Sequence, residues 1–233
     1  MILPSYIWFS PSYFSLKDCD EIVRASLQIP EQEGRIGSDE TDADAPAEKG
    51  HGNQDDSIRT STVKWFDEQT LPPHIAQKLY DVTCLANDET GWRHEFDYKE
   101  NTQYTVYHAE NEKPKGDFYT WHTDAGPQTY DNGCIRKLSM TVQLSDPDEY
   151  EGGHFQWLEP QRQFDKMQIT QYGIETSGKP LIDIEQCICS APFSAKERGS
   201  VIIFPSFLYH QVTPVIRGTR KVLVNWYCGK PYV

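Results

Sequence analysis

The chain has 233 residues and a formal net charge of −13 at pH 7, because 35 Asp and Glu residues outnumber 22 Lys and Arg residues. This balance argues against a sequence-independent nucleic-acid binder and a polybasic membrane-surface protein, since both need a basic face. Hydrophobic residues make up 37% of the chain and aromatic residues 12%, which suffices for a core and favours β structure. No apolar run reaches the roughly 18 residues of a transmembrane helix, and no export leader is visible, so we expect a cytoplasmic protein.

The first part of the chain predicts two amphipathic helices separated by an acidic segment. Residues 12–29 contain an N-cap-like Ser15 followed by apolar side chains at helical spacing, and residues 73–87 repeat that spacing after Pro72. The segment 31–57 holds nine acidic and two basic residues and no aromatic residue. Since it has almost nothing to bury, we predict a mobile loop that is dispensable for folding. The predicted apolar faces comprise Leu16, Cys19, Ile22, Val23 and Leu27 in the first helix, and Ile75, Leu79, Val82 and Leu85 in the second.

The remainder of the chain alternates apolar and polar residues with the period of two that is typical of β-strands. Two helices followed by about eight strands predict a β-sandwich or jelly roll with the helices packed on one outer face. We expect a single domain over 1–233, in which 1–100 is a helical support region and 101–230 is the β core. The clearest strand candidates are residues 103–109, 136–145, 153–158, 181–189, 200–204 and 220–228.

A possible metal site begins with the sequence Trp-His-Thr-Asp, which contains His122 and Asp124. Residues i and i+2 of an extended strand face the same side, so this imidazole and carboxylate could converge on one ion. By itself such a pair is more often structural than metal binding. His210, which follows an apolar strand-like run, is the candidate third ligand. Two histidines and one carboxylate form the facial arrangement expected for non-haem Fe(II) oxygenases.

Arg220 follows His210 by ten residues. We interpret the intervening sequence as a strand, a turn near Gly218 and a returning strand, a hairpin that would bring Arg220 back toward the metal. The residues after Arg220 form a buried-looking strand, where an unpaired guanidinium would be costly. We therefore predict an anionic partner for Arg220, because its planar fork suits a carboxylate.

At this point the sequence resembles the Fe(II)/2-oxoglutarate-dependent dioxygenases, and within them the prolyl 4-hydroxylase-like branch with the PKHD-type hydroxylases. The resemblance rests on H-x-D, a later His and an Arg ten residues on, together with three flanking motifs. It covers about residues 103–227. The flanking motifs are Leu-Ser-Asp-Pro-Asp-Glu-Tyr-Glu-Gly-Gly at 144–153, Phe-Pro-Ser at 204–206, and Val-Thr-Pro-Val at 212–215 with Gly218.

The resemblance implies a double-stranded β-helix, or jelly roll, with N-terminal supporting helices packed on one sheet. It also implies roles for individual residues. Arg220 would pair with the distal carboxylate of 2-oxoglutarate, and Tyr107 would help to hold that co-substrate. Relatives often carry a Tyr or Lys in the region that Thr141 and Gln143 face, so the resemblance does not identify a second anchor of 2-oxoglutarate in this chain. The implied iron ligands are His122, Asp124 and His210, and the implied substrate-facing residues are Tyr119, Arg136 and Trp226.

The activity implied by the resemblance is hydroxylation of a prolyl or other residue of a peptide or protein. O₂ would be consumed, succinate and CO₂ released, and ascorbate would serve as reductant. Two alternatives stay open. One is a cupin-like metal enzyme that has the same double-sheet fold but does not use an oxoacid. The other is a non-enzymatic jelly-roll binding module.

Overall fold

The computed structural model describes residues 5–35, 54–109, 116–126, 129–130, 132–159 and 187–232. These residues form two α-helices and fourteen β-strands, which confirms the predicted mainly β architecture. The helices are α1 (Leu16–Ser26) and α2 (Pro73–Glu89). The strands are β1 (Trp8–Ser10), β2 (Gln32–Glu33), β3 (Arg59–Thr60), β4 (Thr62–Phe66), β5 (Tyr98–Lys99), β6 (Thr102–His108), β7 (Phe118–His122), β8 (Ile135–Gln143), β9 (Tyr150–Gly152), β10 (Phe155–Leu158), β11 (Ile188–Ser190), β12 (Val201–Pro205), β13 (His210–Val212) and β14 (Val215–Gly229).

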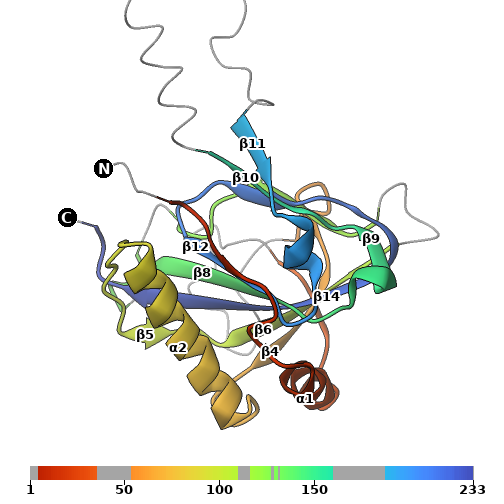
Figure 1. Ribbon diagram of the computed structural model, residues 1–233, viewed down its shortest axis with the longest axis horizontal. Helices are drawn as coiled ribbons and strands as arrows, with labels where there is room; N and C mark the ends of the chain where they lie inside the picture. The colour runs from red at the N-terminus through yellow and green to blue at the C-terminus, as the bar shows by residue number, and fades with distance from the viewer. Residues whose placement is uncertain are drawn as a thin grey trace, which may run out of the picture.

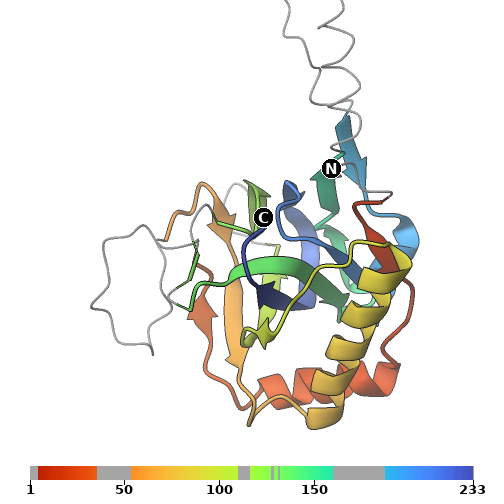
Figure 2. The same cartoon turned by 90° about the vertical axis from the view of Figure 1, so that its left-hand side faces the viewer.

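The strands assemble into two antiparallel sheets (Figures 1 and 2). The larger sheet has the order β1-β12-β8-β14-β6-β4-β2, and β5 and β9 also pair with β14. The smaller sheet has the order β11-β10-β13-β7-β3. Both helices lie on the side of the larger sheet that faces away from the smaller one (Figure 1). No helix among the described residues is long and apolar enough to cross a membrane.

Helix α1 begins where the sequence predicts. The Ser15 hydroxyl accepts a hydrogen bond from the Asp18 amide (3.2 Å), and the Asp18 carboxylate accepts one from the Ser15 amide (2.9 Å). This reciprocal capping satisfies two backbone donors that a helix otherwise leaves unpaired. The predicted apolar face is too wide at its ends, because Leu16 is 60% exposed and Leu27, which follows the helix, is 69% exposed.

Helix α2 also starts at Pro73, as predicted. Its predicted face is wrong at Leu85, which is 40% exposed, while Ala86 is fully buried. The buried positions 75, 79, 82 and 86 follow the 3.6-residue period, and Leu85 falls beside that stripe.

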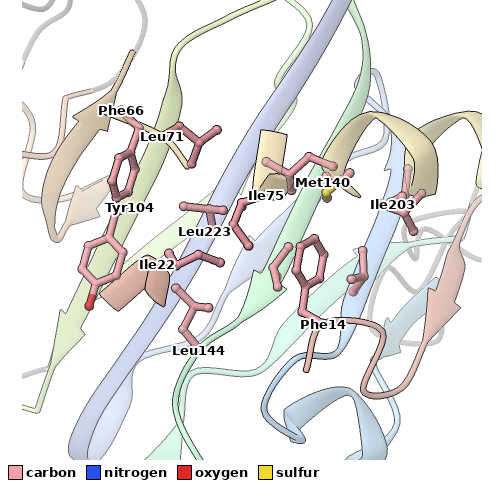
Figure 3. Close-up of a cluster of buried hydrophobic side chains, with 14 of the residues drawn as sticks. Phe14, Ile22, Phe66, Leu71, Ile75, Tyr104, Met140, Leu144, Ile203 and Leu223 are labelled. Atoms are coloured by element: carbon pink, nitrogen blue, oxygen red, sulfur yellow. The ribbon is translucent and has the colours of Figure 1, made fainter. Parts of the chain in front are cut away.

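The main hydrophobic core lies between the helices and the larger sheet. Strand β8 shows how the sequence builds it, because Leu138, Met140 and Val142 point toward the helices and are almost fully buried. Figure 3 shows Ile22 and Ile75 of the two helices together with sheet residues of this core. Alternate residues of a strand face opposite sides, so Ser139 and Thr141 of β8 face the smaller sheet.

Strand β14 corrects the predicted hairpin. Val215–Gly229 is one continuous strand, so the predicted turn near Gly218 is wrong. Gly218 has a φ of +74°, and a Cβ there would overlap the carbonyl oxygen of Glu149. The glycine therefore permits a close approach between β14 and the segment leading into β9 rather than a reversal. The chain instead changes sheets between the end of β13 at Val212 and the start of β14 at Val215.

The acidic segment 31–57 is only partly covered by the structure. Its first residues, Gln32–Glu33, form strand β2 and pair with β4, so the prediction of a loop is wrong there. Backbone pairing holds these two residues although both are exposed, which a prediction from burial alone misses. Residues 36–53 lie outside the described residues, and the predicted mobility of the segment stays a prediction.

Candidate metal centre

The three predicted metal ligands come together at one end of two adjacent inner strands, β7 and β13, of the smaller sheet. His122 is the last residue of β7 and pairs in register with His210, the first residue of β13. Asp124 lies beyond the end of β7, so the expectation that His122 and Asp124 share a continuous strand is wrong. The Asp124 amide instead donates a hydrogen bond to the carbonyl of Ser206 (2.9 Å). A backbone anchor outside the strand thus brings the carboxylate to the two histidines.

The geometry of the three side chains fits a divalent metal ion. Their ligand atoms lie within 4.8 Å of one another. His122 Nε2 is 3.6 Å from Asp124 Oδ1, and His210 Nε2 is 3.7 Å from Asp124 Oδ2. Both distances are too long for hydrogen bonds, so the nitrogens face the carboxylate without bonding to it.

Backbone carbonyls fix the tautomers of the two histidines. His122 Nδ1 bonds to the Thr120 carbonyl (2.7 Å), and His210 Nδ1 bonds to the Leu208 carbonyl (2.9 Å). A carbonyl oxygen only accepts, so each Nδ1 carries a hydrogen, and in the neutral form of such a ring Nε2 keeps its lone pair. This arrangement, a ring oriented through its other nitrogen, is typical of metal-binding histidines.

Electrostatics favours the metal-binding forms of Asp124 and His210. Burial raises the pKa of Asp124, but His210, His122 and Arg136 together outweigh it and hold that pKa well below its usual value. Burial and the nearby His122 lower the pKa of His210 to about 4. At neutral pH Asp124 is therefore a carboxylate and His210 a neutral imidazole, as a cation requires.

Arg220 lies on β14, directly opposite Tyr107 of β6, and its guanidinium carbon is 5.5 Å from the Tyr107 ring. It is only 5% exposed, and its Nε and Nη1 have no hydrogen-bond partner among the described residues. Unpaired buried donors are costly, so this group fits an anion such as a carboxylate. Burial raises the pKa of the Tyr107 phenol, which Arg220 opposes and Asp124 reinforces. Tyr107 is thus within electrostatic reach of both parts of the site.

The Gly-Gly pair of the sequence motif at 144–153 makes room for Arg220. Gly153 has a φ of +55°, and a Cβ there would lie 2.8 Å from Arg220 Cδ. The aromatic ring of Tyr150 also borders this space, at 3.5 Å from the same Cβ position. Burial raises the pKa of Tyr150, and the Arg220 guanidinium beside it opposes that rise.

Of the three predicted substrate-facing residues, Tyr119 and Arg136 lie near the metal group, and Trp226 contacts Arg136. The Tyr119 ring stacks on the His122 ring with centroids 3.4 Å apart. Arg136 lies over the Trp226 ring (4.0 Å), and its charge acts on the Asp124 carboxylate. Trp226 is 5% exposed, and its Nε1 has no hydrogen-bond partner within the described part of the chain.

Sequence reasoning missed two residues that support this site. Glu100 receives two hydrogen bonds from Arg136, both 2.6 Å long, and no local pattern signals that pairing across 36 positions. Arg59 lies over the Tyr119 ring at 4.8 Å. The signal that the sequence offered for Arg59 was a basic residue within Ile-Arg-Thr-Ser at 58–61, directly before a strand-like run. Thr141 and Gln143 are the residues that, by the resemblance, face the region where relatives often carry Tyr or Lys. Gln143 donates a hydrogen bond to the Ser145 carbonyl (3.3 Å).

The structure thus brings together two histidines and a carboxylate that could hold one metal ion, and it also holds a buried arginine, two of whose nitrogens lack a partner among the described residues. A family model described as the 2OG-Fe(II) oxygenase superfamily matches residues 102–228. That match covers more than half of the chain and includes these three ligand residues and the arginine. The chain belongs to the 2OG-Fe(II) oxygenase superfamily.

Among curated relatives, a PKHD-type hydroxylase of Synechococcus sp. (strain CC9605) is 31% identical over 111 residues, which is 48% of this chain and 36% of that protein. The Escherichia coli PKHD-type hydroxylase YbiX is 27% identical over 118 residues, covering 50% of this chain and 40% of that protein. The chain thus spans little more than a third of the length of the curated relatives it matches.

Among solved structures, the viral collagen prolyl hydroxylase of Paramecium bursaria Chlorella virus-1 has a TM-score of 0.57 at 16% identity, covering 97% of each chain. A prolyl hydroxylase from Trichoplax adhaerens, bound to a peptide fragment of hypoxia inducible factor, has a TM-score of 0.61 at 12% identity. It covers 96% of this chain and 84% of that one. These likenesses confirm the predicted jelly-roll fold.

Proposed function

We propose that the chain is an Fe(II)- and 2-oxoglutarate-dependent hydroxylase acting on a prolyl or other residue of a peptide or protein. The observation that carries this proposal is a histidine–carboxylate group together with the buried Arg220, two of whose nitrogens have no partner among the described residues. The first suits a divalent metal and the second suits a carboxylate. Membership of the 2OG-Fe(II) oxygenase superfamily supports Fe(II) and 2-oxoglutarate as these two ligands.

In this proposal His122, Asp124 and His210 hold Fe(II) and leave further coordination positions open. Arg220 pairs with the distal carboxylate of 2-oxoglutarate, and Tyr107, opposite it, helps to hold the co-substrate. Bound Fe(II) supplies the oxidation chemistry, in which O₂ and 2-oxoglutarate are consumed, succinate and CO₂ are released, and the substrate gains a hydroxyl group. Ascorbate is proposed as the reductant that keeps the iron ferrous.

The surrounding residues orient ligands and exclude water. The rings of Phe155 and Phe204, 5.5 and 4.6 Å from the His210 ring, cover that ligand with apolar surface. Glu100 fixes Arg136, which in turn lies over the Trp226 ring. A reactive metal site needs such a dry and rigid enclosure, because water would otherwise compete with the substrate.

Peptide recognition is assigned to Tyr119, Arg136 and Trp226. The buried, unpaired Nε1 of Trp226 can donate to a substrate carbonyl, which supports this assignment. The solved Trichoplax neighbour carries a bound peptide, which supports a peptide or protein substrate. We also propose that residues 1–233 form a single dioxygenase domain, because Arg59 and Glu100 of the 1–100 region contact residues of the 101–230 core.

The test is an anaerobic titration of the protein with Fe(II) and then with 2-oxoglutarate, followed by measurement of succinate release against a peptide panel under air. We expect one Fe(II) site, 2-oxoglutarate binding, and succinate release that rises with a peptide substrate. Fe(II) binding without 2-oxoglutarate binding would favour a cupin-like metal enzyme. The absence of a defined Fe(II) site would favour a non-enzymatic binding module.

A further inference from the structure

The orientation of the His122 imidazole depends on an aromatic neighbour as well as on its backbone hydrogen bond. The Tyr119 ring lies almost parallel to the His122 ring, with an interplanar angle of 12° and centroids 3.4 Å apart. A β-bulge between β7 and β13 makes this possible, because Val212 pairs with Tyr119 while His210 pairs with His122. The ring plane of His122 is therefore set by the position of the Tyr119 ring.

The Tyr119 ring is in turn held by Arg59 of β3. Arg59 pairs with Tyr119 in register, and its guanidinium carbon lies 4.8 Å from the centre of the Tyr119 ring. Arg59 is only 6% exposed, so this cation–π contact is made largely out of water, where such contacts are strongest.

The Arg59 guanidinium is itself fixed by polar contacts. Its Nε donates to Ser61 Oγ (2.9 Å), and its Nη1 donates to the carbonyl of Arg35 (3.1 Å). The backbone of Gly34 packs against it so closely that a Cβ there would lie 2.8 Å from Arg59 Nε. Two segments of the support region, residues 34–35 and Ser61, thus hold one cation in a single position.

We infer that Arg59 is a positioning residue for the metal ligand His122 and that it acts through Tyr119. The inference rests on the proposed metal site, and it extends that site to a residue outside the part of the chain matched by the family model. A rigid stack of guanidinium, phenol and imidazole limits rotation of the His122 ring, so its Nε2 is held toward the metal before the metal binds.

The expected effect is a loss of metal affinity. Groups that orient a metal ligand typically contribute 10- to 100-fold to affinity, so Arg59→Gln is expected to weaken Co(II) binding by roughly tenfold or more. Co(II) serves as an oxygen-stable probe, and calorimetry gives its affinity independently of turnover. Arg59→Lys keeps a positive charge over the ring and should recover part of the loss. The absorption bands of bound Co(II) should shift in Arg59→Gln, because the geometry at His122 changes.

A double-mutant cycle separates action through Tyr119 from a general structural role. If Arg59 acts through that ring, the Arg59→Gln/Tyr119→Leu double variant binds Co(II) no more weakly than Tyr119→Leu alone. Arg198→Gln is the matched control. Arg198 is another partly buried arginine with a backbone and a carboxylate partner, Leu144 and Asp20, and it contacts none of the metal ligands. Its Co(II) affinity and spectrum should equal those of the unmodified protein.

Three results would overturn the inference: a folded Arg59→Gln protein with unchanged Co(II) affinity and spectrum, independent effects of the Arg59 and Tyr119 substitutions, or an equal loss in Arg198→Gln. If Arg59→Gln does not fold, Ser61→Ala is the alternative variant, because it removes one hydrogen bond that holds Arg59. Ser61→Ala should weaken Co(II) binding by about threefold, and unchanged affinity would count against the inference. Failure of the unmodified protein to bind Co(II) and 2-oxoglutarate would overturn this inference and the proposed function together. Normal binding of both by all variants would overturn this inference alone.

Discussion

Replacement of Arg220 by Ala tests the proposed co-substrate directly. The guanidinium is 5% exposed, and two of its nitrogens have no partner within the described part of the chain. A carboxylate bound there would form a charge pair removed from water. Loss of one partner of such a pair costs on the order of 2–5 kcal/mol, because the other charge is left unpaired. Since each 1.4 kcal/mol is tenfold, Arg220→Ala should weaken 2-oxoglutarate binding by roughly 30-fold or more.

The assay is calorimetric titration of 2-oxoglutarate into Co(II)-loaded protein, with Co(II) affinity measured separately. Arg220→Ala should leave Co(II) affinity unchanged, because none of the metal ligands is altered. Arg220→Lys should recover only part of the loss, since a point charge cannot reproduce the planar fork of arginine. Arg198→Ala, which removes an arginine remote from the site, should bind 2-oxoglutarate normally.

Thermal stability gives an independent check on the same residue. In the free protein the substitution has two opposing effects on the free energy of unfolding. Removal of a buried charge stabilises the fold, and loss of the packing of the side-chain stem against Gly153 destabilises it. We expect these effects to offset within about 1 kcal/mol, or about 2–4 °C in Tm. A well-folded Arg220→Ala protein that binds 2-oxoglutarate as tightly as the unmodified protein would refute the co-substrate site and favour a metal enzyme without an oxoacid.

Three further outcomes are expected. His210→Ala removes one of three metal ligands, so Co(II) affinity measured by calorimetry should fall by roughly 100-fold or more. Unchanged affinity would show that His210 is not a metal ligand. Gly153→Ala places a Cβ against the Arg220 stem at a positive φ, so urea unfolding should show a loss on the order of 1–3 kcal/mol and 2-oxoglutarate should bind more weakly. Ser15→Ala removes the cap of α1 and should cost about 1 kcal/mol in urea unfolding without changing Co(II) affinity, and a change in affinity would contradict the separation of cap and site.

The elements that can be predicted from sequence are those with local signals. The cap at Ser15 and the proline at the start of α2 mark helix starts that the structure confirms, because both signals act within one turn. Gly218 misled the prediction for a physical reason. A glycine can serve a reversal or a close backbone approach, and only the position of Glu149 distinguishes the two.

The residues of the candidate site also fall into those that the sequence predicts and those that it does not. His122, Asp124 and His210 are recognisable because a metal demands particular donor types, and the structure brings them together. The residues that orient these ligands cannot be recognised from the sequence, because the role of a residue such as Glu100 depends only on its contact with Arg136 in the folded chain. No local periodicity encodes a pairing between two distant strands. Long-range polar contacts therefore limit what a single sequence reveals.

The alternation along β8 and β14 bears on how the protein can change over evolutionary time. One face of these strands, including Met140 and Leu223, holds the helices, while Thr141 and Arg220 lie on the other. A substitution at a position such as Thr141 alters the lining between the sheets but removes no side chain from the core against the helices. Selection can thus adjust what the protein binds without altering the core that packs against the helices.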